Sequence, residues 1–282
     1  MPKIFTEQQV ENFHSQGFLV AGSVLSLSEV DYYRGRLESF ESKYPNDVRK
    51  LKSKSHLLCP WVEEIARNEN VLDVYEDLIG PNILCYSMAF RTKNPDGKTF
   101  AGWHQDGAAN PIKPILVIGV LALADCTVAH GCLKVIPGSH KATALAHMDT
   151  GNPDSILSRG QYITDGFDES KAVDLELKAG EISLFNASVI HSSPVNSTDE
   201  RRLVLLVEMM PTHTEIRAHR DSAMLVRGVD EYHHVNFDPS PKVEFGPEEL
   251  AAWRNATKET GKNVFAGSPL TPSDVYGGQP AK

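Results

Sequence analysis

The stretch AVDLELKAGEISLFNA, residues 172–187, contains two short apolar runs that alternate with polar residues and meet at Gly180. Alternation of this kind is typical of a strand with one buried face, and glycine favours a turn between two strands. Similar runs occur on both sides of this stretch, bounded by Gly, Pro, Asn and Asp. The sequence therefore predicts further strands within residues 82–92, 100–106, 115–125, 131–139, 189–195 and 202–211. Such a series of short strands favours a sandwich or barrel over a parallel α/β sheet.

The first 80 residues follow a helical pattern instead. Thr6 is a candidate cap for a first helix, and apolar residues within 26–40 fall on one stripe at helical spacing. A third helical stretch is predicted to begin near Pro60 and to stop at Gly80. Because amphipathic helices need an apolar surface to pack on, the predicted fold class is mainly β with flanking α-helices.

The sequence contains no repeat and no clear domain boundary, so one domain is predicted for residues 1–282. Its expected parts are a helical N-terminal part at about 1–80, a strand-rich core at about 81–212 and a C-terminal extension at about 213–282. Residues 141–170 are polar and too numerous for a simple hairpin loop. They are a candidate lid or binding loop.

Composition bears on the partners and on the compartment. The formal net charge is −9, with 28 basic and 37 acidic residues, which disfavours a nucleic-acid surface or an anionic membrane as a partner. The four cysteines form no CxxC pair, and no apolar run has the length of a signal peptide or a membrane span. A cytoplasmic protein with a small-molecule substrate is therefore expected, while the oligomeric state is left undetermined.

His104 and Asp106 stand two apart at the end of a predicted strand, in the sequence FAGWHQDGAANP. On a strand they would project to one face, either as a solvated polar pair or as two metal ligands. So short a motif recurs by chance, so a metal site needs a third ligand, and His191 at the end of an apolar run is the best candidate. Two histidines and one carboxylate leave three adjacent positions open, as a non-haem Fe(II) oxygenase requires.

Arg201 and Arg202 begin the last predicted strand of the core. Neighbouring strand residues point to opposite faces, so only one of these arginines can enter a barrel. An arginine on the inner face would bind an anion such as a carboxylate bidentately, and the other arginine would remain a surface charge.

The motifs WHQD, GCLKVIPGSHK, LKAGEISLFNASVIHSSPVNST and ERR together resemble the phytanoyl-CoA dioxygenase-like family of Fe(II)/2-oxoglutarate-dependent oxygenases. The resemblance implies a double-stranded β-helix, the jelly-roll or cupin-like core, with Fe(II), 2-oxoglutarate as cosubstrate and O₂. It implies that His104, Asp106 and His191 bind iron. It also implies that Arg202 holds the far carboxylate of 2-oxoglutarate with help from Ser193.

The retained Asp106 bears on the reaction. Halogenases of the family replace this aspartate by a small residue so that chloride can bind the iron, so the resemblance favours hydroxylation, desaturation or epoxidation. The expected reaction is hydroxylation of an aliphatic carbon, coupled to decarboxylation of 2-oxoglutarate to succinate and CO₂. Three alternatives stay open: a desaturase, epoxidase or halogenase relative, a catalytically silent jelly-roll used as a binding module, and a zinc hydrolase or isomerase.

The substrate is expected to be a small polar metabolite, such as an amino acid-like or aminophosphonate compound or a natural-product intermediate. The acidic balance of the chain disfavours a large polyanion such as an acyl-CoA. Three residues are candidate substrate contacts. Arg91 and Lys93 lie on the strand before WHQD and can bind an acidic group, and Asn110 lies in the loop after the predicted ligands.

Overall fold

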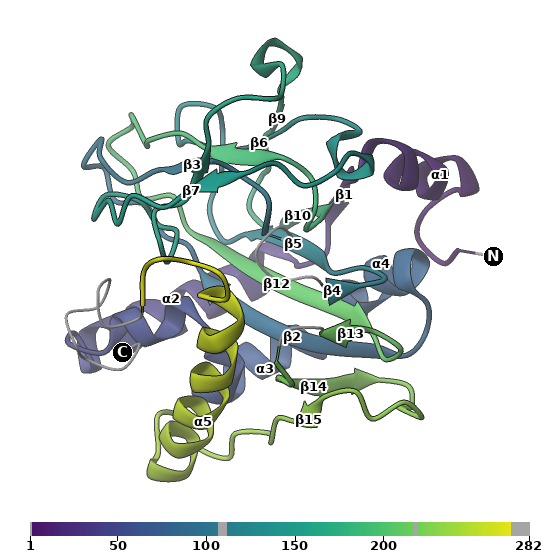
Figure 1. Ribbon diagram of the computed structural model, residues 1–282. Coiled ribbons are helices and arrows are strands. Elements are labelled where there is room, and N and C mark those ends of the chain that lie inside the picture. Colours follow the sequence, from purple (N-terminus) through teal and green to yellow (C-terminus); the bar gives the residue numbers. More distant parts are fainter. Residues whose placement is uncertain (1, 107–111, 217–218, 272–282) are drawn as a thin grey trace.

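The computed structural model describes residues 2–106, 112–216 and 219–271 (Figure 1). Within these residues the α-helices are α1 (Glu7–Gln16), α2 (Leu27–Lys43), α3 (Pro60–Ala66), α4 (Glu69–Ile79) and α5 (Pro247–Val264). Thr6 caps α1, as predicted, because its side chain accepts the backbone N–H of Gln9 at 3.2 Å.

The predicted third helical stretch is two helices rather than one. It begins at Pro60 and stops at Gly80 as predicted, but α3 ends at Ala66 and α4 begins at Glu69. The side chain of Asn68 accepts the backbone N–H groups of Asn70 and Val71, at 3.0 and 3.3 Å. This cap starts a new helix at a point where the apolar spacing alone gave no sign of a break.

A seven-stranded sheet forms the larger part of the core, and all its neighbouring strands are antiparallel except β14 and β15. In spatial order its strands are β1 (Phe18–Ser23), β10 (Glu181–Asn186), β5 (Val117–Ala122), β12 (Val204–Pro211), β2 (Ile83–Phe90), β14 (Ser222–Arg227) and β15 (Asn236–Phe237). Strands β1 and β14 lie outside the residues 81–212 expected for the core, so segments from both ends of the chain complete this sheet.

A four-stranded sheet faces the large one. Its strands, in order, are β3 (Ala101–His104), β11 (His191–Ser193), β6 (Leu133–Val135) and β9 (Val173–Leu175). Buried side chains of both sheets form one apolar cluster between them, which includes Ile118 and Phe185 from the large sheet and Val135 and Leu175 from the small one. Two sheets packed in this way form the jelly-roll core that the sequence predicts, so the expected fold class is confirmed.

The other face of the large sheet is covered by the N-terminal helices (Figure 1). Their apolar stripes, with Phe13, Leu37 and Trp61 as examples, pack on strand residues such as Leu121 and Val207 in a second apolar cluster. Two short strand pairs complete the described structure: β4 (Ile112–Lys113) with β13 (Glu215–Ile216), and β7 (His147–Met148) with β8 (Tyr162–Ile163). Burial of the large sheet on both faces explains why its central strands are almost entirely apolar.

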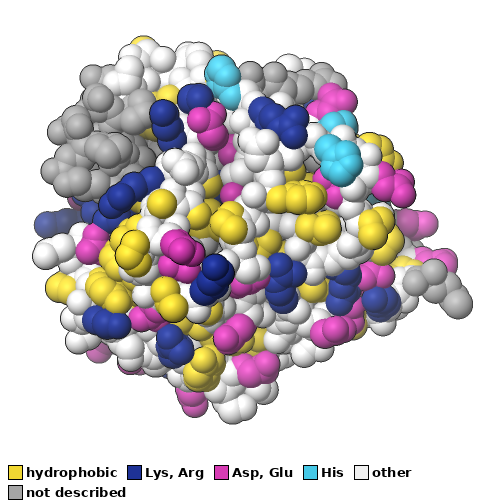
Figure 2. Space-filling model, turned by 90° about the horizontal axis from the view of Figure 1, so that it is seen from below, with side chains coloured by type: hydrophobic (Ala, Val, Ile, Leu, Met, Phe, Trp, Pro, Cys, Tyr) yellow, Lys and Arg dark blue, Asp and Glu magenta, His cyan; other side chains and the backbone are white. Residues whose placement is uncertain are grey.

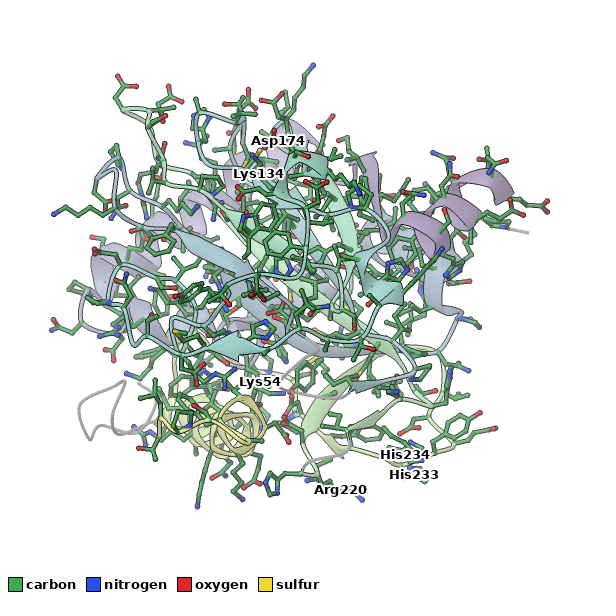
Figure 3. The ribbon with its side chains drawn as sticks, turned by 45° about the horizontal axis from the view of Figure 1, so that its top comes forward. Lys54, Lys134, Asp174, Arg220, His233 and His234 are labelled. Atoms are coloured by element: carbon green, nitrogen blue, oxygen red, sulfur yellow. The ribbon has the colours of Figure 1, made fainter. Side chains whose placement is uncertain are left out.

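Helix α5 contacts β14 of the large sheet and lies near a buried lysine (Figures 1 and 3). The ammonium group of Lys54 donates to the carbonyl oxygens of Ser222 and Tyr86, at 2.7 and 2.9 Å, and lies 3.0 Å from the carboxylate of Asp238. A fully buried lysine needs such a set of oxygen partners. Lys54 therefore ties the segment before α3 to strands β2 and β14.

The surface carries charges of both signs. On the face seen from below, Lys and Arg side chains are interspersed with Asp and Glu (Figure 2). On the small sheet, Lys134 and Asp174 stand opposite one another on β6 and β9, with 3.7 Å between the ammonium and carboxylate groups (Figure 3). Among the helices of the described residues, none is long and apolar enough to cross a membrane.

Candidate metal centre

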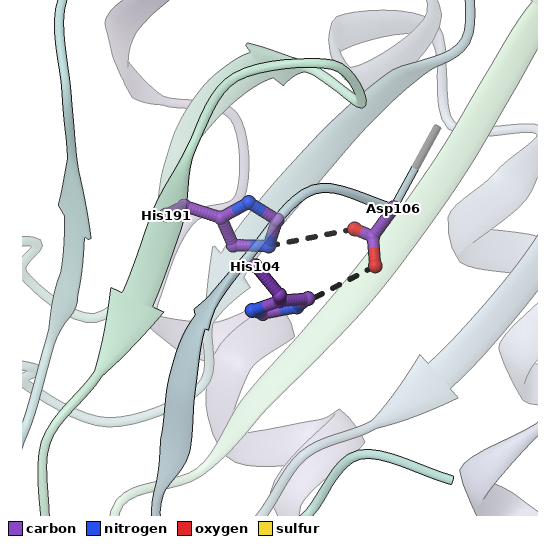
Figure 4. Close-up of side chains that lie close together, drawn as sticks. All are labelled: His104, Asp106 and His191. Atoms are coloured by element: carbon purple, nitrogen blue, oxygen red, sulfur yellow. Dashed lines mark ion pairs between the residues drawn. The ribbon is translucent and has the colours of Figure 1, made fainter. Parts of the chain in front are cut away.

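Strand pairing brings His104 and His191 together. His104 ends β3 and His191 begins β11, and the two residues are direct partners in the antiparallel register. Their imidazole ring centroids are 4.0 Å apart, and Asp106 follows β3 by two residues. The carboxylate oxygens of Asp106 lie 3.5 Å from Nε2 of His104 and 3.4 Å from Nε2 of His191 (Figure 4). The three residues present their ligand atoms within 4.8 Å of one another, as a metal site requires.

Backbone carbonyls orient both imidazole rings. Nδ1 of His104 lies 2.8 Å from the carbonyl oxygen of Gly102, and Nδ1 of His191 lies 2.9 Å from that of Val189. A carbonyl oxygen only accepts, so each Nδ1 carries the proton and donates it. Each Nε2 is then left with a lone pair directed at Asp106 and its neighbour, which is the tautomer that binds a metal ion.

The protonation states also suit a divalent cation. Burial, reinforced by the neighbouring charge of His104, lowers the pKa of His191 to about 4, so its imidazole is neutral near pH 7. Burial alone would raise the pKa of Asp106, but the imidazoles of His191 and His104 outweigh burial and hold this pKa below its ordinary value. The His191 nitrogen and the Asp106 carboxylate are therefore ready to coordinate a metal without first losing a proton, and His104 adds a second imidazole nitrogen to the set. This donor set is the one that non-haem Fe(II) sites use.

A buried arginine lines the same cavity as the predicted metal ligands. Both Arg202 and His191 line it, and the Arg202 side chain is 3% exposed. Its guanidinium donates to Ser193 Oγ at 2.5 Å, to the Gly131 carbonyl at 2.6 Å and to the Arg91 carbonyl at 3.1 Å. Within residues 2–106, 112–216 and 219–271 it has no carboxylate partner, and its Nε has no hydrogen-bond partner. Burying an unpaired guanidinium costs several kcal/mol, so the site is built for an anion.

Gly131 supplies the backbone oxygen that fixes this arrangement. Its φ of 69° is in the left-handed region, and a Cβ at this position would lie 2.1 Å from the Pro194 carbonyl oxygen. Only glycine fits such a turn. The Gly131 carbonyl accepts from both Arg202 and Ser193, so the turn holds the two predicted 2-oxoglutarate contacts in place.

Lys93, a predicted substrate contact, lies beside Arg202. Lys93 and Arg202 pair across a β-bridge, and the Lys93 ammonium donates to Ser193 Oγ at 2.6 Å and to the Ser193 carbonyl at 2.9 Å. The Lys93 side chain is fully buried, and burial together with the charge of Arg202 lowers its pKa to about 6. The guanidinium of Arg202 and the amine of Lys93 therefore meet at one serine hydroxyl.

Arg201 points to the opposite face, as the alternation of strand residues predicts. Its guanidinium contacts both carboxylate oxygens of Glu41 on α2, at 2.9 and 2.8 Å, and the side-chain oxygen of Asn94 at 3.1 Å. One arginine of the pair is thus engaged at the outer surface of the sheet, and Arg202 is the one that enters the barrel.

A second cavity, of about 710 Å³, opens from the metal centre towards the surface. Asp106 and Arg91 line both cavities, so the outer one reaches the predicted ligands. Arg91 thus lines the outer cavity, and its role as a substrate contact stays a prediction, whereas Asn110 lies outside the described residues. The volume is in the range of about 300–1,000 Å³ that is usual for small-molecule sites.

Residues 141–170 form one wall of the outer cavity, through Ala142, Thr143, Leu157 and Ser158 among others. Gln105, which stands between the two predicted ligands, holds this segment. Its side chain accepts the backbone N–H of Leu145 at 2.9 Å and donates to the Ser188 carbonyl at 2.7 Å. The segment expected to be a lid or binding loop is therefore hydrogen-bonded to the residue that lies between two predicted metal ligands.

Glu208 is a cavity residue that the sequence analysis missed. It lies on β12 and lines both cavities. Burial and the nearby charge of Asp106 raise the pKa of Glu208 to about 7. The available signal was an acidic residue in the middle of the apolar run VLLVEMM, at a position where alternation points inward.

A family model described as phytanoyl-CoA dioxygenase (PhyH) matches residues 13–204, well over half of the chain. The chain belongs to this family. PhyH enzymes are non-haem oxygenases that use Fe(II), 2-oxoglutarate and O₂, and the His104, Asp106 and His191 cluster provides the metal site of such an enzyme here. The expected enzyme class and cofactors are therefore confirmed.

A curated relative and two solved structures are similar to this chain. A probable phytanoyl-CoA dioxygenase of Caenorhabditis elegans is 28% identical over 225 residues, which cover 70% of this chain and 72% of that protein. The apo structure of the non-haem monooxygenase ThoJ has a TM-score of 0.81 and 25% identity, covering 91% of this chain and 97% of ThoJ. The epimerase SnoN, solved with Fe³⁺, alpha-ketoglutarate and nogalamycin RO, shares the fold with a TM-score of 0.62 and 20% identity, covering 75% and 85% of the two chains.

Proposed function

We propose that this PhyH protein hydroxylates an aliphatic carbon of a small polar metabolite, coupled to decarboxylation of 2-oxoglutarate to succinate and CO₂. The observation that carries the proposal is the placement of two complementary sites in one cavity. His104, Asp106 and His191 gather in this cavity, and the guanidinium of Arg202, which has no carboxylate partner among the described residues, lines it as well. A chelating dicarboxylate fits between a divalent metal and an arginine.

Each residue has a defined task in this proposal. His104, Asp106 and His191 would hold Fe(II), which when bound supplies the activation of O₂ that drives oxidation of the substrate. Arg202 and Ser193 would bind the carboxylate of 2-oxoglutarate that lies far from the metal. Apolar side chains of the same cavity, among them Val120, Leu133 and Phe185, exclude water from the cosubstrate.

Asp106 favours hydroxylation over halogenation. Its carboxylate lies within 3.5 Å of both histidine Nε2 atoms, so it would occupy a metal position that a halide needs. The size of the outer cavity suits a free small molecule, such as an amino acid-like or aminophosphonate compound or a natural-product intermediate. Arg91, which lines both cavities, is proposed to contact its acidic group.

Anaerobic titration of the purified protein with Fe(II) and then 2-oxoglutarate tests the cosubstrate site. We expect a weak visible charge-transfer band, because chelation places a 2-oxo acid in contact with Fe(II). A metabolite library is then screened for compounds that stimulate succinate release, and the product mass should exceed that of the substrate by one oxygen atom. Absence of the band in fully reconstituted protein would contradict the proposal, and a product lighter by two hydrogens would redirect it to desaturation.

Lys93 leads to a prediction about pH. Its pKa of about 6 in the free protein means that the amine is mostly neutral at pH 7, but a bound carboxylate would favour the ammonium form. Binding of 2-oxoglutarate should therefore take up a proton, and its affinity should fall as the pH rises above about 6. Calorimetry in two buffers of different ionisation enthalpy measures this uptake.

The variant Lys93→Met should abolish the pH dependence, and Lys134→Met is the matched control, because Lys134 pairs with Asp174 on the outside of the small sheet. If 2-oxoglutarate affinity has the same pH dependence in wild type and in Lys93→Met, Lys93 is not the group that takes up the proton.

A further inference from the structure

Glu208 is an acidic side chain on the inner face of the barrel. The inner stripe of β12 also contains Val204 and Leu206, which line the inner cavity with Glu208. The pairing of β12 with β2 is irregular between Glu208 and Met209. A bulge at this point redirects the strand beside the cavity, as bulges next to active sites commonly do. Glu208 thus faces the space between the metal centre and the outer cavity.

No structural partner satisfies this carboxylate. Among the residues that the structure describes, Glu208 takes part in no side-chain hydrogen bond and no ion pair. Two acids with nearly buried side chains are paired, Asp238 with Lys54 at 3.0 Å and Asp149 with Arg159 at 3.4 Å. Glu208 is half-buried, and a carboxylate without a partner at a cavity wall is often kept where a ligand supplies the missing contact.

The wall of the outer cavity away from the metal carries the opposite charge. Lys52, at the end of the short helix Val48–Lys52, lines the outer cavity and a neighbouring groove, which Arg49 also lines. Desolvation of the Lys52 ammonium group by the cavity walls, together with the charges of Arg91 and Arg49, lowers the pKa of Lys52. In the described part of the chain neither Lys52 nor Arg49 has an acidic partner. Two such neighbouring cations favour binding of an anion at this wall.

We propose that the outer cavity binds a zwitterion, with its cationic group on Glu208 and its anionic group on Lys52. The order of the two ends follows from the lining, because Glu208 borders the metal cavity and Lys52 borders the surface groove. The cationic end, an ammonium or guanidinium group, therefore lies nearer the metal. This inference deepens the proposed function and rests on it, since it names the chemical class of the hydroxylated metabolite.

An internal ion pair would be the competing explanation for Glu208. Arg91 is the candidate partner, since its charge acts on the Glu208 carboxyl. Its guanidinium donates to the backbone carbonyl of Lys52 at 2.6 Å. Among the described residues no ion pair joins Arg91 to Glu208, so the Glu208 carboxylate stays available to a ligand.

The test uses the full chain with a panel of small zwitterions: α- and ω-amino acids and 2-aminoethylphosphonate, each beside its N-acetyl derivative. Dissociation constants are measured by calorimetry on protein loaded with Ni(II) and 2-oxoglutarate, and succinate release is measured on the Fe(II) enzyme. At least one zwitterion should bind and stimulate succinate release, and its N-acetyl derivative should bind at least about tenfold more weakly because the charge-assisted contact is lost.

Two variants separate the ends of the site. In Glu208→Gln, the dissociation constants of the zwitterion and of its N-acetyl derivative should become nearly equal. Lys52→Met should weaken binding of the zwitterion but not binding of the corresponding amine without an acidic group. Glu200→Gln is the matched control, because the Glu200 side chain is 78% exposed. An unchanged charge-transfer band with Fe(II) and 2-oxoglutarate establishes that each variant is folded.

The outcomes distinguish this proposal from the proposed function. If the charge-transfer band forms but no cationic compound of the panel binds, the zwitterion site is overturned and the oxygenase assignment stands. The site is also overturned if Glu208→Gln keeps the wild-type ratio. If wild-type protein forms no band, the proposed function fails, and the zwitterion site fails with it.

Discussion

Replacing His104 by alanine should lower substrate-dependent succinate formation by at least about a thousandfold, because removal of one member of a catalytic unit disables the whole unit. The two remaining ligands, Asp106 and His191, would keep their orientation, since the Val189 carbonyl holds the imidazole of His191 independently of His104. A two-ligand site binds Fe(II) weakly, so stoichiometric binding should be lost as well. Both quantities can be measured, by coupled assay and by metal analysis after desalting.

The fold should survive this change. His104 is a terminal strand residue whose side chain contacts the metal centre and the Gly102 carbonyl, not the large apolar clusters. His233→Ala is the control, because that imidazole is 73% exposed. The thermal unfolding midpoint of apo His104→Ala should stay within a few degrees of wild type, as expected for a loss of about 1 kcal/mol. Full Fe(II) binding by the variant would remove His104 from the site.

The sequence was most informative where two constraints coincided. The strand alternation in 172–187 predicted β9 and β10 because a jelly-roll strand must present one apolar face to the space between the sheets. The spacing of His104 and Asp106 predicted a metal site only together with His191, which belongs to a neighbouring strand. Register explains this success, since antiparallel pairing sets His191 directly opposite His104.

Other features of the structure depend on contacts between residues far apart in the sequence, which a local sequence pattern cannot predict. Strand β1 lies between two helices, and its half-buried residues become a strand by pairing with β10, more than 150 residues away in the sequence. Lys93 contacts Ser193, a partner that the sequence pattern did not predict, since a long flexible side chain can meet any oxygen within several ångströms of its strand position.

Arg202→Ala should raise the 2-oxoglutarate concentration needed for half-maximal turnover by about a hundredfold or more, as expected when one partner of a buried charge pair is truncated. The requirement for Fe(II) should change little, because the guanidinium of Arg202 contacts Ser193 and two backbone carbonyls and none of the three metal ligands. Initial rates of succinate formation at saturating substrate, measured over a wide range of 2-oxoglutarate, separate the two effects.

Arg201→Ala is the matched control, since its guanidinium binds Glu41 outside the barrel and should leave the 2-oxoglutarate requirement near the wild-type value. Arg202→Lys should recover only part of the lost 2-oxoglutarate affinity. An ammonium group lacks the planar fork of N–H donors with which a guanidinium can bind Ser193 and the carboxylate at once. An unaltered requirement in Arg202→Ala would mean that Lys93 alone binds the anion. That result would in turn require Lys93→Met to be the more damaging variant, so the two cations that meet at Ser193 can be ranked by one pair of titrations.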